Sequence, residues 1–134
     1  MEQIAFEVEL RLPVSEALER VTTALKAEGF GILTSIDVRD TFKQKLGEDF
    51  RPYYILGACN PALAHRALSR DGRIGLMLPC TVTLEEDPQG FSRVRIANPE
   101  MMVQVGDLGK DEVLREVAGQ ARTRLERTAN ALRG

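Results

Sequence analysis

The chain has little of the chemistry from which active sites are usually built. It contains no tryptophan, one histidine and two cysteines in 134 residues. A histidine dyad is therefore impossible, and the two thiols and one imidazole need a carboxylate or a water to complete a four-ligand zinc site. No glycine-rich, phosphate-binding pattern follows an expected strand. Catalytic classes that depend on these motifs are disfavoured.

The chain also lacks a charge excess and a long apolar run. Its 18 basic and 20 acidic residues are interleaved and leave a net charge of −2, so no extended positive field exists to collect the phosphates of a nucleic acid. The N-terminus shows no export leader, and no run approaches the length that spans a membrane. We expect a cytoplasmic protein with free thiols and with neither nucleic acid nor membrane as partner.

What is present is an ordinary globular composition. Hydrophobic residues make up 43% of the chain and charged residues 28%, and the length is close to the commonest size of one domain. Glycine and proline are spread along the sequence rather than concentrated in a linker. We expect a single domain over residues 1–134.

Periodicity predicts the elements along the chain. Residues 3–11 alternate in polarity as a half-buried strand, and the spacing then becomes helical until Gly29 ends the first long helix. Further strands are expected over 30–38, 53–58, 74–86 and 91–97. The 74–86 segment is predicted as one strand passing through Pro79, because its apolar residues keep a single parity that also places Cys80 on the core face.

Helices are expected between and after these strands. Asp40 is the expected cap of a short helix ending near 46, and Asn60 of a helix that begins at Pro61 and ends near 69. A short turn or helix follows Asn98, and a long amphipathic helix closes the chain. The predicted fold is α+β, in the order β-α-β(4)-α, a mostly antiparallel curved sheet with two long helices on one face and short helical insertions.

The candidate site is the junction Cys59-Asn60-Pro61. A thiol just before a helix N-terminus meets partial positive charge and free amide groups, which favour a thiolate or a bound anion. We therefore predict that Cys59 is more reactive than Cys80. The alternative is that Cys59 is simply a small buried side chain at a strand end.

Two functions are compatible with this pattern. The first is a binding module for a small molecule, an anion or a protein partner near Cys59, Asn60, Pro61 and His65. The second is a thiol-dependent or metal-dependent enzyme that uses Cys59, His65 and Cys80, because soft sulfur and nitrogen ligands suit zinc or copper. His65 points off the apolar stripe of its helix, and no cofactor can be named from the residues.

Three stretches carry a resemblance to a known family: Ile55-Leu56-Gly57-Ala58-Cys59-Asn60-Pro61, Ala64-His65-Arg66-Ala67-Leu68 and Leu78-Pro79-Cys80. Over about residues 16–86 the chain resembles domain-of-unknown-function family 302. The resemblance implies a fold similar to the TATA-binding-protein-like α+β arrangement and a homodimer, with no established activity. The apolar character of 53–58 on both parities is consistent with such a dimer, in which this strand or the adjoining Phe50 loop is buried.

Overall fold

The computed structural model describes residues 3–134 and is built on one five-stranded sheet. Every strand pairing is antiparallel, and the spatial order is β1-β5-β4-β3-β2. The strands are β1 (Ala5–Leu10), β2 (Gly31–Asp37), β3 (Tyr53–Cys59), β4 (Cys80–Glu86) and β5 (Ser92–Ala97). The five predicted strands are all present, although the fourth is shorter than expected.

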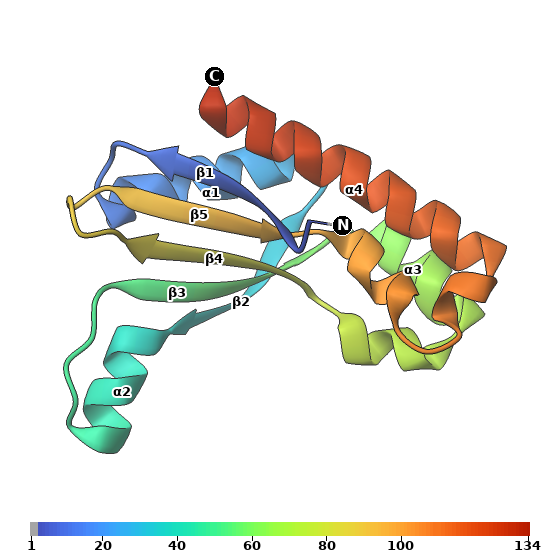
Figure 1. The fold of residues 1–134 in the computed structure, drawn as a ribbon, viewed down its shortest axis with the longest axis horizontal. Helices are drawn as coiled ribbons and strands as arrows, with labels where there is room; N and C mark the ends of the chain where they lie inside the picture. The colour runs from blue at the N-terminus through green and yellow to red at the C-terminus, as the bar shows by residue number, and fades with distance from the viewer. Residues whose placement is uncertain (1–2) are drawn as a thin grey trace.

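Helices cover one face of the sheet (Figure 1). The long helices α1 (Val14–Ala27) and α4 (Glu112–Arg133) lie side by side on it, and α3 (Pro61–Arg70) packs against α4 beyond the end of the strands. Short 3-10 helices η1 (Gly72–Met77), η2 (Pro99–Gln104) and η3 (Leu108–Lys110) complete this end. The predicted α+β fold with two long helices on one face is confirmed. No helix within residues 3–134 is both long and apolar enough to cross a membrane.

The core lies between the sheet and these helices. Alternate strand residues such as Val82, Leu84 and Val94 are fully buried, and they meet Val21 and Leu25 of α1, which are equally buried. Burying one such side chain contributes roughly 1.5–3 kcal/mol. The period-two and helical stripes of the sequence are therefore the faces that fold together.

The opposite face of the sheet carries a row of ion pairs. Arg95 on β5 bonds Glu7 on β1 at 2.9 Å and also contacts Glu85 on β4, and Arg51 bonds Glu85 at 2.9 Å. Burial alone would raise the pKa of Glu85, but hydrogen bonds from the two arginines outweigh burial and hold that pKa below its ordinary 4.5. The part of the open face formed by β1, β5 and β4 is therefore solvated and charged.

Helix α2 (Val38–Leu46) forms an arm that stands away from the body of the domain (Figure 1). None of its residues is buried, and Phe42 makes an edge contact with Phe50 at 5.1 Å between ring centroids. The predicted cap Asp40 is wrong: Asp37 is the cap, and its carboxylate accepts from the Asp40 amide at 2.9 Å. The strand therefore ends one residue earlier than predicted, because Asp37 has the extended backbone of a capping residue.

The prediction of one strand over 74–86 is also wrong. Residues 72–77 form η1, in which Ile74 is buried but Leu76 is 86% exposed, so the single parity does not describe one face of a strand. The Asp71 carboxylate accepts from the Arg73 amide at 2.9 Å and begins a helical turn. The ladder of β4 starts only at Cys80, after Pro79, which has no amide hydrogen to donate.

Candidate functional site

Asn60 organises the passage from β3 into α3. Its side-chain oxygen accepts from the Leu63 amide at 3.2 Å, and its backbone oxygen accepts from the Ala64 amide at 2.9 Å. Pro61 has no amide hydrogen, so Ala62 alone keeps a free amide in this first turn. The predicted cap is confirmed, but the helix end has little donor capacity left for an anion.

The Asn60 side chain lies against Gly29, at the end of α1. Gly29 has φ +84°, and a Cβ there would lie 2.9 Å from Asn60 Nδ2 and 3.4 Å from Arg124 Nη1. Arg124 itself donates to the Glu28 carbonyl at 3.2 Å. Glycine is needed at this position both for its backbone conformation and for the close approach of Asn60. The cap of α3 is thereby tied to α1 and α4.

A second close contact joins the other two motif segments. A Cβ on Gly57 would overlap Thr34 Oγ1 and would lie 2.6 Å from Pro79 Cγ. Pro79 thus packs directly over Gly57, and Thr34 of β2 fills the remaining space on that side of the strand. The Leu78-Pro79-Cys80 segment is placed beside the end of β3 by this contact, which requires glycine at position 57.

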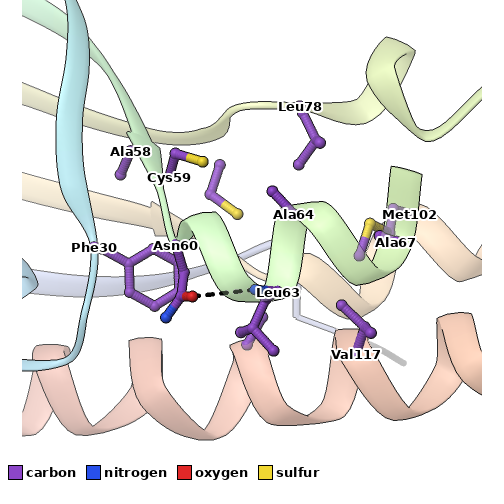
Figure 2. A pocket seen from close by; sticks show the side chains of 12 residues that line it. Phe30, Ala58, Cys59, Asn60, Leu63, Ala64, Ala67, Leu78, Met102 and Val117 are labelled. Atoms are coloured by element: carbon purple, nitrogen blue, oxygen red, sulfur yellow. Dashed lines mark hydrogen bonds between the residues drawn. The ribbon is translucent and has the colours of Figure 1, made fainter. Parts of the chain in front are cut away.

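A small apolar cavity lies between the start of α3, the end of β3 and α4 (Figure 2). Its volume is about 20 Å³. The walls carry apolar side chains, the sulfurs of both cysteines and of Met102, and the capping residue Asn60. The complete lining is Phe30, Ala58, Cys59, Asn60, Leu63, Ala64, Ala67, Leu78, Cys80, Met102, Val117 and Ala121.

Both thiols face this cavity although they come from different strands. Cys80 pairs with Ala58 in the ladder and packs against the core, as its predicted parity requires. Cys59 is the last residue of β3, and its sulfur is directed over the first turn of α3 (Figure 2). Neighbouring strand residues normally face opposite sides of a sheet. Here Ala58 and Cys59 both line the cavity because the strand ends there and the chain turns into α3.

The environment distinguishes the two thiols. Desolvation by burial, together with the electrostatic influence of Cys59, raises the pKa of Cys80 from 9.0 to about 11. At neutral pH Cys80 is therefore a protonated, partly buried thiol. The predicted order of reactivity, with Cys59 ahead of Cys80, is consistent with this placement and remains a prediction.

His65 is not brought into this group. It lies on the exposed face of α3 and does not line the cavity that the two cysteines share. Within residues 3–134 no three side chains from the His, Cys, Asp and Glu types are grouped so as to hold a metal. The structure therefore joins two of the three residues predicted as metal ligands and leaves the third outside.

Three contributors to the site were not identified from the sequence. Met102 reaches the cavity from η2, and Arg124 reaches Gly29 from α4. Gly57 is covered by Pro79, so that two separate motif segments form one unit. Gly57 is part of a quoted motif and Gly29 is the predicted end of the first helix, but nothing local indicates which residues approach them.

Comparisons with known proteins place this geometry in a family. The model of the family described as "Domain of unknown function DUF302" matches residues 6–132. A search of curated proteins gave no match. A crystal structure of an uncharacterised conserved DUF302 protein from Bacillus stearothermophilus superposes with a TM-score of 0.84 at 30% identity, covering 96% of this chain and 98% of that chain. The chain that builds the Cys59 and Cys80 cavity belongs to the DUF302 family.

Proposed function

We propose that the protein is a dimeric, cytoplasmic binding module that holds an ion-sized ligand in the cavity at the start of α3. The observation that carries this proposal is the meeting of both thiols, Cys59 and Cys80, in one apolar cavity. Sulfur is the most reactive and the most strongly ligating atom type in that lining.

The size of the cavity selects the class of ligand. Pockets for organic ligands usually measure roughly 300–1,000 Å³, whereas this cavity measures about 20 Å³. A volume of about 10–15 Å³ on this measure holds one water molecule. The space therefore suits a single ion or atom rather than an organic substrate.

The alternative, a thiol-dependent or metal-dependent enzyme using His65, has less support. His65 is exposed and lies outside the cavity lining. A general base must reach the proton it removes, directly or through one water. The cavity lining contains no histidine, carboxylate, lysine or arginine beside the thiols. Binding is therefore the better-supported function.

Dimer formation is the second part of the proposal. Among residues 3–134, strand β2 pairs only with β3, which leaves its outer edge unpaired there. Its Leu33 and Ile36 are 69% and 49% exposed. On the adjoining arm Leu46 is 67% exposed. Helix α2 has nine residues and no buried side chain, so packing against its own domain stabilises it little. Two β2 edges related by a two-fold axis would pair antiparallel and bury both arms.

Native mass spectrometry of protein isolated without an affinity tag tests the ligand. The expected result is a chain mass increased by a bound species, and the increase is absent in Cys59→Ser. Wild-type protein found entirely at its chain mass would contradict the binding function. Cys59→Ser is a closely matched variant of the wild type, because it removes one sulfur atom and changes the side-chain volume little.

Light scattering tests the dimer. Wild-type protein is expected at twice the 14.9 kDa chain mass, and Ile36→Lys is expected to shift it toward the monomer. Leu76→Lys is the matched control, because Leu76 is also exposed but lies on η1, away from β2. A wild-type monomer at micromolar concentration would reject this part of the proposal.

A further inference from the structure

We propose that the cavity is a binding site for a soft monovalent cation, Cu(I), held between the sulfur atoms of Cys59 and Cys80. The inference rests on the proposed function and names the ligand of that same site. It follows from which donor atoms reach the cavity and how many of them there are.

The donor atoms on the cavity wall are soft. Cys59 and Cys80 each present a thiol, and Met102 adds a thioether to the same lining. The one polar side chain in the lining belongs to Asn60, and its oxygen is already bonded to the Leu63 amide. Thiolate and thioether ligands select Cu(I), whereas calcium and magnesium need several oxygen ligands.

The number of donors separates Cu(I) from zinc. Zinc binds four ligands in nearly all protein sites, and the lining of this cavity offers two cysteines with no histidine or carboxylate. A cavity of about 20 Å³ has room for the ion but not for the waters that would complete a zinc shell. Cu(I) accepts two or three sulfur ligands, so the pair of thiols is sufficient for it.

Binding changes protonation but not oxidation state. Each thiol releases its proton to solvent as its sulfur bonds to copper, so one Cu(I) displaces two protons and remains Cu(I). The bis-thiolate complex then carries one negative charge. The N-terminal end of α3 lies beside it, because Asn60 caps that helix and lines the cavity. The partial positive charge of the helix end favours the anionic complex.

A competition titration tests the proposal. Reduced, untagged protein is added under anaerobic conditions to Cu(I) held by bathocuproine disulfonate, and the loss of the coloured complex is followed together with proton release. Wild-type protein is expected to withdraw one Cu(I) per chain. Cys59→Ser and Cys80→Ser are each expected to weaken that withdrawal by roughly 100-fold or more, since even supporting partners of a metal ligand are worth about 10–100-fold.

Two control variants should retain wild-type affinity. His65→Ala removes the imidazole outside the cavity, and Met101→Leu removes a sulfur that lines only the neighbouring cavity. Circular dichroism checks that each variant is folded, and Cys80→Ala replaces Cys80→Ser if the hydroxyl prevents folding.

The inference is overturned if wild-type protein leaves the copper with its competitor, or if the cysteine variants withdraw it as well as wild type does. A ligand seen by native mass spectrometry together with no Cu(I) binding would refute the copper assignment alone. The absence of both would refute the proposed function as well.

Discussion

Replacing Gly57 by alanine tests the contact that joins the two motif segments of the site. The new Cβ would overlap Thr34 Oγ1 and would lie 2.6 Å from Pro79 Cγ. The proline ring is rigid, so the 78–80 segment must move away from β3. Overpacking of this kind costs about 1–3 kcal/mol, and we expect about 2–3 kcal/mol because two neighbours are displaced.

Urea unfolding of Gly57→Ala and Gly31→Ala measures this cost. Gly31 also lies in the sheet, but a Cβ there would meet nothing within 4 Å, so its replacement is expected to change the free energy of unfolding by about 0.5 kcal/mol or less. The displaced Pro79 should also expose Cys80 and speed its alkylation. Equal unfolding midpoints for the two variants would refute the packing of Pro79 on Gly57.

The remaining predictions concern the thiols and the cap. In timed labelling with iodoacetamide at neutral pH, mapped by mass spectrometry, Cys59 is expected to react before Cys80, and equal protection of both would contradict this. The raised pKa of Cys80, about 11 against 9.0, means that the metal-free folded state holds this proton more tightly than the unfolded state. The corresponding stability, about 2–3 kcal/mol, is present below pH 9 and lost as pH rises toward 11; unfolding of Cys80→Ala should lack that alkaline decline. Gly29→Ala should cost about 2–3 kcal/mol, from positive-φ strain plus a displaced Asn60 cap. Gly47→Ala, with φ +68° and open space around it, should show the strain alone in the same unfolding assay.

Most of the fold could be predicted because its information is local. The faces that pack together can be identified from local patterns. These patterns are the alternation in residues 5–10 and 92–97 and the helical spacing in α1 and α4. The segment before Pro79 resembles a strand because Ile74, Leu76 and Leu78 share a parity, but residues 72–77 form a 3-10 helix and Leu78 follows its end. There the capping Asp71 decides the conformation, not the apolar pattern.

The site could be predicted only in part. The cap Asn60 and the core position of Cys80 follow from neighbouring residues, and both are confirmed. The approach of Pro79 to Gly57, and of Asn60 to Gly29, joins segments far apart in the chain. The helical spacing also predicted that His65 points off the apolar stripe, and His65 is exposed and outside the cavity lining. Periodicity cannot specify such tertiary contacts.

We propose above that Cys59 and Cys80 share one ligand at the start of α3. A crystal structure of the reduced protein with Ag(I), a redox-inert substitute for Cu(I), tests it most directly through the anomalous scattering of silver. We expect one strong peak between the two cysteine sulfurs. A peak at His65 or at an exposed site, with none between the thiols, would contradict it.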